Sequence, residues 1–115
     1  MQLPVQVTFR ALSPSPSIDQ HVRRRVAKLD TFYERIMGCR VVVEVPHRHH
    51  KHGKRYHVRI DITVPGHELV VGRNPSENLN HEDVHAAIDD AFDDAERMVE
   101  DHARRLRQDR KSLHH

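Results

Sequence analysis

Three consecutive arginines, followed by a lysine three residues later, are the side chains of this chain with the clearest binding chemistry. Arg23, Arg24 and Arg25 precede Lys28 in the segment HVRRRVAK. Arginine stays charged and presents a planar fork of donors that suits a phosphate group, and lysine adds a point charge. Only two acidic residues lie nearby, so the pattern favours binding of a polyanion over an ordinary solvated helix face.

A second basic group lies in the last third of the chain. Its predicted contact residues are Arg97, Arg104, Arg105 and Lys111. Acidic residues four positions earlier can pair with several of them, but such surface pairs contribute only about 0.3–0.5 kcal/mol each. A polyphosphate could displace them. The pattern favours binding from Arg104 onward and a solvated, self-paired face before it.

Histidine and basic residues alternate in the segment 47–57, which is expected to be a hairpin tip. The imidazoles that could bind zinc or nickel belong to His47, His49, His50 and His52. The basic residues that could contact phosphate, and that would repel a metal cation, are Arg48, Lys51 and Lys54. A polar tip without a ligand is the favoured interpretation, and the metal-binding or metal-sensing interpretation remains the main functional alternative.

Catalysis has little support in the sequence. The four aspartates between positions 89 and 94 would spread around a helix as a solvated acidic run. The single Cys39 falls where a core or sheet position is expected, and no glycine-rich phosphate loop is present. We therefore expect no catalytic residue, no cofactor and no small-molecule substrate.

Charge and composition limit the classes of protein to which this chain can belong. Residues 1–60 hold twelve Lys/Arg and four Asp/Glu, a balance of +8, whereas residues 61–115 hold seven and thirteen, a balance of −6. A basic half suggests an anionic partner, unless the halves neutralise each other across the fold. No apolar run approaches the ~20 residues of a membrane span, and one cysteine is typical of a reduced, cytoplasmic setting. A single domain over 1–115 is expected, with 1–2 and 112–115 disordered, as a monomer or weak homo-oligomer.

Two amphipathic helices are predicted to position the basic residues. The first runs from Pro16 to Met37, with Gly38 as its stop. Its apolar stripe is Ile18, Val22, Val26, Leu29, Tyr33 and Ile36. The flank away from this stripe collects His21, Arg24, Lys28 and Arg35. Arg23 lies on the other flank, and Arg25 borders the apolar arc, from where its charged head can reach solvent.

The second helix is predicted from Glu82 to Arg110, and its stripe is Val84, Ile88, Ala91, Ala95, Met98, Val99, His102 and Leu106. It would run roughly 43 Å, whereas an eight-residue strand covers only ~26 Å. Its last turns should therefore project beyond a small sheet and present their arginines to a partner.

Period-two patterns predict four strands, at residues 3–10, 40–45, 56–64 and 69–73. In the third strand, His57 and Arg59 should face away from the core. A right-handed crossover makes the first two strands parallel, and hairpins join the rest. Each strand has one apolar face, so both helices should cover the same side. The prediction is an α+β fold of order β-α-β-β-β-α, a four-stranded mixed sheet with two helices packed on one face.

The segments QHVRRRVAKLDTFYERI and HEDVHAAIDDAFDDAER, separated by a predicted β-hairpin, resemble the ribosome hibernation-promoting factors. This family is also called ribosome-associated inhibitor A, or the sigma-54 modulation proteins. The resemblance extends from about Val5 to Arg105. It implies the same β-α-β-β-β-α fold, similar in arrangement to double-stranded RNA-binding domains.

The resemblance also implies a function, which is inhibition of translation by binding the small ribosomal subunit and its rRNA in the mRNA–tRNA channel. Family basic positions are matched by Arg25, Lys28 and Arg97, and Arg104 and Arg105 fall in the family's basic tail region. Asp94 and Asp101 stand where the family often has Lys or Arg. A third interpretation, besides RNA binding and metal binding, is a module whose oppositely charged halves self-associate.

Overall fold

The computed structural model describes residues 3–45, 55–74 and 83–112, and the side chains of these residues as far as Asp109. Its elements are β1 (Val5–Arg10), α1 (Pro16–Asp30), β2 (Gly38–Glu44), β3 (His57–Val64), β4 (His67–Val71) and α2 (Val84–Ser112). The predicted α+β class and the order β-α-β-β-β-α are confirmed. Ser112, at which a disordered end was predicted, is the last residue of α2.

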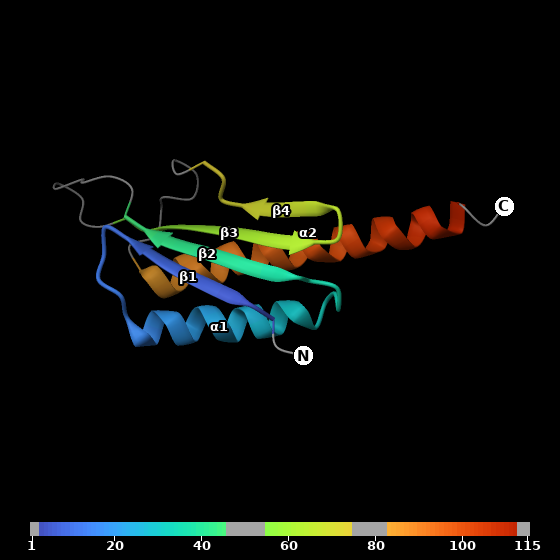
Figure 1. Ribbon diagram of the computed structural model, residues 1–115. Helices are drawn as coiled ribbons and strands as arrows, with labels where there is room; N and C mark the ends of the chain where they lie inside the picture. The colour runs from blue at the N-terminus through green and yellow to red at the C-terminus, as the bar shows by residue number, and fades with distance from the viewer. Residues whose placement is uncertain (1–2, 46–54, 75–82, 113–115) are drawn as a thin grey trace.

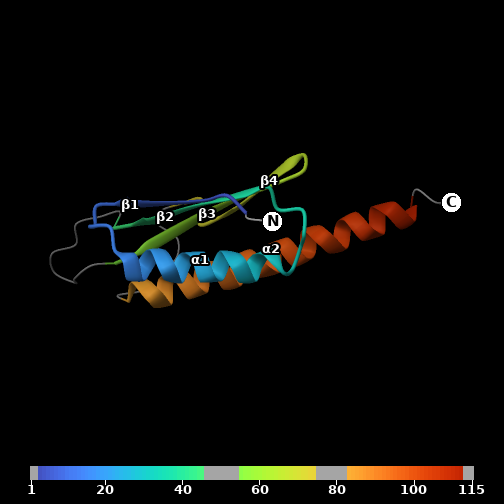
Figure 2. The same cartoon turned by 60° about the horizontal axis from the view of Figure 1, so that its bottom comes forward.

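The four strands form one mixed sheet in the order β1-β2-β3-β4. β1 and β2 are parallel, with Val7 opposite Val41, and the other two pairings are antiparallel. Both helices lie on one face of this sheet, side by side and running in the same direction (Figure 1). The other face carries neither helix, as Figure 2 shows. The predicted placement of both helices on one side is confirmed.

The core lies between the sheet and the helix layer. The apolar residues of the strands alternate inward, as a half-buried sheet requires. Fully buried residues of the sheet and both helices meet there; the largest include Leu29, Ile60, Ile62, Ile88 and Phe92. Phe92 lies outside the predicted stripe of α2 and widens the apolar face of that helix.

Helix α1 ends at Asp30 and not at Met37, so the predicted length is wrong. Ser15 caps its start, because its hydroxyl accepts a hydrogen bond from the Ile18 amide. Its end is fixed by Thr31, whose hydroxyl donates to the Lys28 carbonyl at 2.6 Å. The chain then turns toward β2, and Gly38, predicted to stop the helix, is the first residue of that strand. Ile36 lies in this connecting segment and is buried, so the apolar spacing typical of a helix continues past the end of α1.

Strand β4 starts at His67, two residues earlier than predicted, because the Pro65-Gly66 turn is tight and Gly66 has φ of 76°. It ends at Val71, since Gly72 has φ of 70° and a Cβ there would lie 2.4 Å from the Val58 carbonyl oxygen. Only glycine fits that position without displacing backbone.

Helix α2 extends well past the end of the sheet, as predicted (Figure 1). Its 29 residues span about 43 Å, against about 26 Å for the eight residues of β3. The last buried residue along it is Ala103, and Arg104, Arg105 and Arg107 are exposed. Among the described residues, no helix is both long enough and apolar enough to cross a membrane.

Candidate nucleic-acid interface

Arg25 joins the two helices. Its guanidinium donates to Asp89 at 2.7 Å, to Asp93 at 2.9 Å and to Glu96 at 3.0 Å, all on α2. Its side chain is only 14% exposed, so the expectation that its charged head reaches solvent is wrong. Burial alone would lower the pKa of Arg25, but the three carboxylates outweigh it and raise the pKa. Arg25 is thus neutralised within the protein.

His21 also lies at the contact between α1 and α2, which we call the helix seam, although it was predicted on the exposed flank. It is buried, with Nε2 2.7 Å from Asp89 Oδ1 and Nδ1 2.6 Å from Nδ1 of His85. The two imidazole rings stack with centroids 4.9 Å apart. If Nε2 of His21 donates to Asp89, its neutral Nδ1 can accept from His85, so each short contact holds one proton. The prediction failed because helical spacing alone does not show where α2 packs.

The outer flank of α1 keeps a partly free basic surface. Arg23 pairs with Asp19 at 2.8 Å, and Lys28 lies 3.6 Å from Glu96. Arg24 is exposed and makes no ion pair with any carboxylate that the structure describes. Arg23 and Arg24 lie together over a shallow depression with Gln20 and Ala27.

The projecting end of α2 carries both paired and unpaired arginines. Arg97 pairs with Asp94, and Arg104 pairs with Asp101 at 2.9 Å. Arg105 and Arg107 are exposed and have no ion pair among the described residues. Arg107 was not among the predicted contacts, although the sequence holds a signal: neither Ala103 nor Arg104, one turn earlier, is acidic. The side chain of Lys111 lies outside the described residues.

Arg35 lies in the segment between α1 and β2, not on α1. It is exposed, makes no ion pair in the described part of the chain, and faces the same cavity of about 380 Å³ as Arg107. The structure therefore brings Arg35 together with the end of α2 and separates it from Arg24 and Lys28. Of the described arginines without an ion pair, Arg35, Arg105 and Arg107 thus lie near the projecting end of α2, whereas Arg24 lies on α1.

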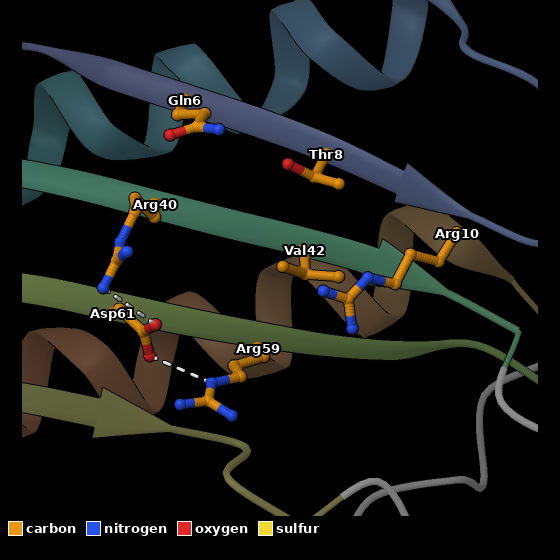
Figure 3. Close-up of a pocket in the computed structure, with 7 residues that line it drawn as sticks. All are labelled: Gln6, Thr8, Arg10, Arg40, Val42, Arg59 and Asp61. Atoms are coloured by element: carbon orange, nitrogen blue, oxygen red, sulfur yellow. Dashed lines mark hydrogen bonds and ion pairs between the residues drawn. The ribbon is translucent and has the colours of Figure 1, made fainter.

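The open face of the sheet carries a third basic group, which sequence reasoning did not identify as a site. Arg10, Arg40 and Arg59 surround a depression of about 230 Å³ over Val42 (Figure 3). Carboxylates neutralise this group: Asp61 lies 3.0 Å from Arg59 and 3.6 Å from Arg40. A further pair joins Arg40 to Glu68 at 2.8 Å, and Arg10 lies 3.9 Å from Glu44. This face is therefore a weaker anion surface than the end of α2.

Two titratable groups have shifted pKa values that bear on chemistry. Burial, followed by the charge of Asp61, raises the pKa of the Cys39 thiol to about 12. The thiolate is therefore scarce at neutral pH, which disfavours a nucleophilic role. Burial, followed by the charges of His67 and Arg105, lowers the pKa of His102. His102 is held edge-on against the rings of Tyr33 and His67.

The proposed hairpin-tip contacts and metal ligands at positions 47–54 lie outside the described residues. His57, at the end of that segment, was expected to face solvent, but it is buried, and its Nδ1 lies 2.9 Å from Glu44. Among the residues that the structure describes, no group of three or more His, Cys, Asp or Glu is arranged to hold a metal ion.

Fold and surface together define a small α+β domain with a helix layer on one face and unpaired arginines at one end. Residues 5–107 match the family described as Sigma 54 modulation protein / S30EA ribosomal protein, and the chain belongs to this family. The resemblance noted in the sequence is thereby confirmed.

Solved structures share the fold. The N-terminal domain of Protein Y from Thermus thermophilus superposes with a TM-score of 0.65 at 23% identity, over 87% of this chain and 97% of that one. A ribosomal subunit interface protein from Coxiella burnetii gives a TM-score of 0.69 at 13% identity, over 88% of this chain and 98% of that one. No curated protein matches the chain significantly in sequence.

Proposed function

We propose that this protein is a non-catalytic, cytoplasmic hibernation factor that binds the small ribosomal subunit and inhibits translation. Membership of a ribosomal protein family supports the ribosome as partner. The structural likeness to a ribosomal subunit interface protein is consistent with this fold serving that role. The mRNA–tRNA channel is the proposed binding site, because the resemblance to the ribosome hibernation-promoting factors implies it.

The observation that carries the proposal is the projecting end of α2. Arg105 and Arg107 there, together with Arg35, are exposed and make no ion pair with a described carboxylate. Phosphate contacts of this kind position a protein on RNA without reading its bases. The paired arginines Arg97 and Arg104 can add contacts, because exposed pairs contribute little.

The test is co-sedimentation with purified small ribosomal subunits. Reversing Arg105 and Arg107 to Glu should abolish co-sedimentation while leaving the fold intact, since both side chains lie outside the core. The matched control reverses Arg10 and Arg73 to Glu, which changes the charge equally. Arg10 is the last residue of β1 and Arg73 follows β4 in the sequence, and both strands end away from the projecting end of α2 (Figure 1). If the Arg105/Arg107 variant sediments with subunits as wild type does, the proposed surface is wrong.

A further inference from the structure

The cavity beside the projecting end of α2 combines cations with apolar rings. Its walls come from the segment after α1 and from the last described turns of α2. The residues that matter are Phe32, Tyr33, Glu34, Arg35, Leu106 and Arg107. These segments lie about seventy residues apart in the sequence, so the combination is visible only in the fold.

The wall formed by the connecting segment is fixed at both ends. The amide of Phe32 donates to the Leu29 carbonyl at 3.0 Å, and the amide of Met37 donates to the Thr63 carbonyl at 2.7 Å. Ile36 anchors the segment in the core at 1% exposure. The Tyr33 ring rests edge-on against His102 of α2, with centroids 5.4 Å apart. The wall formed by the connecting segment is therefore preformed, which lowers the entropic cost of binding.

The chemistry of the lining fits a nucleotide better than a simple anion. Arg35 and Arg107 have no ion pair with the described carboxylates, so they can contact phosphate. Phe32, Tyr33 and Leu106 offer apolar surface for a base, and Glu34 offers an acceptor for an exocyclic amino group. A volume of about 380 Å³ lies within the range of small-ligand sites.

We infer that this cavity, which we call the base groove, takes one unstacked nucleotide of single-stranded RNA. The inference rests on the proposed function and deepens it, because it adds a base contact to a surface otherwise suited to phosphates. Arg35 and Arg107 hold the flanking phosphates, and the base lies against the rings and Leu106. The protein would therefore prefer RNA with an accessible, unpaired base over a fully paired duplex.

The test uses a short single-stranded RNA carrying 2-aminopurine, whose fluorescence falls when the base stacks. The protein contains no Trp, so the probe signal is easily separated. Wild type should quench the probe, and an otherwise identical RNA lacking that base should bind roughly tenfold more weakly. Leu106→Glu should abolish quenching, because it replaces apolar surface that the base would contact with a second carboxylate beside Glu34. Leu106 is not part of the buried core, and circular dichroism verifies the fold.

A matched pair of double variants separates the contribution of the base groove to RNA binding from that of overall charge. Arg35→Gln with Arg107→Gln should weaken binding at least tenfold, whereas Arg23→Gln with Arg24→Gln, the same charge change on α1, should retain quenching. Equal affinity for the intact and the base-lacking RNA, or equal quenching by Leu106→Glu, overturns the inference. Failure of wild type to sediment overturns the proposed function instead.

Discussion

At the scale of single residues, Arg25 and Arg24 are neighbours with opposite roles. Arg25 is 14% exposed and contacts three carboxylates of α2, whereas Arg24 is exposed and contacts none that the structure describes. A buried guanidinium that is hydrogen-bonded to several carboxylates holds elements together, and removal leaves those carboxylates facing one another. An unpaired surface arginine contributes little to stability and remains available to a partner.

Arg25→Ala should therefore destabilise the protein by about 2 kcal/mol, since it leaves Asp89, Asp93 and Glu96 without their shared cation. Arg24→Ala, one position away, should change the free energy of unfolding by less than about 0.5 kcal/mol. Urea unfolding followed by circular dichroism measures both. A small and equal effect of the two substitutions would show that Arg25 does not join the helices.

Asp89 gives the seam a pH dependence. Burial alone would raise its pKa, but hydrogen bonds from His21 and Arg25 outweigh burial and lower the pKa. A carboxyl whose folded pKa lies below its unfolded value of about 3.9 stabilises the fold above that pH. This stabilisation is lost as pH falls through the lower, folded pKa.

Asp89→Asn should accordingly lower stability at pH 5 and have little effect well below pH 3. The exposed Asp109→Asn serves as the control and should leave the pH profile unchanged. Urea midpoints across this range measure the difference. If the urea midpoints of wild type and Asp89→Asn changed equally with pH below pH 4, Asp89 would be excluded as the source of this pH dependence.

At the scale of elements, α2 consists of a supported and an unsupported part. Residues as far as Ala103 pack on the sheet or on α1, whereas positions 104, 105 and 107 to 109 are exposed. A short helical end without tertiary contacts is marginally stable in water. Local pairs such as Arg104 with Asp101 add only a few tenths of a kcal/mol.

Amide hydrogen exchange should reveal this boundary. Amides between Ile88 and Val99 should exchange only by global unfolding, and amides from Arg107 onward should exchange orders of magnitude faster. Binding to the small subunit should then slow exchange at this end, because the RNA orders it. Uniform protection along the whole of α2 in the free protein would contradict the division.

The elements also show what periodicity can and cannot predict. Alternation in β2 and β3 and the three-to-four spacing of α2 were sufficient for the order, the class and the projecting end. The end of α1 was not predictable, because Tyr33 and Ile36 continue the helical spacing from a non-helical segment. His57 was expected to face solvent because alternation does not reveal its contact with Glu44 or the close approach of Gly72.

The candidate site was predictable only in part for a related reason. Residue types and their spacing identify the arginines as candidate contact residues. The carboxylates that neutralise Arg25, however, lie more than sixty positions away in the sequence, on α2. The opposite charges of the two halves of the chain are thus partly paired across the helix seam. Among the described arginines that make no ion pair with a described carboxylate are Arg24, on α1, and a group at the projecting end of α2: Arg35, Arg105 and Arg107.

At the scale of the whole molecule, this charge distribution predicts how binding depends on salt. Each cation that contacts an RNA phosphate releases counterions, so the logarithm of the affinity falls linearly with the logarithm of the salt concentration. The slope is roughly −0.7 to −0.9 for each contact. Arg105→Gln should therefore reduce the magnitude of the slope by about one contact, whereas Arg10→Gln, on the open sheet face, should leave the slope unchanged. Co-sedimentation with small subunits over a salt series measures both variants against wild type. An equal reduction by the two variants would mean that the sheet face and the helix end both contact RNA, and the one-ended interface would have to be abandoned.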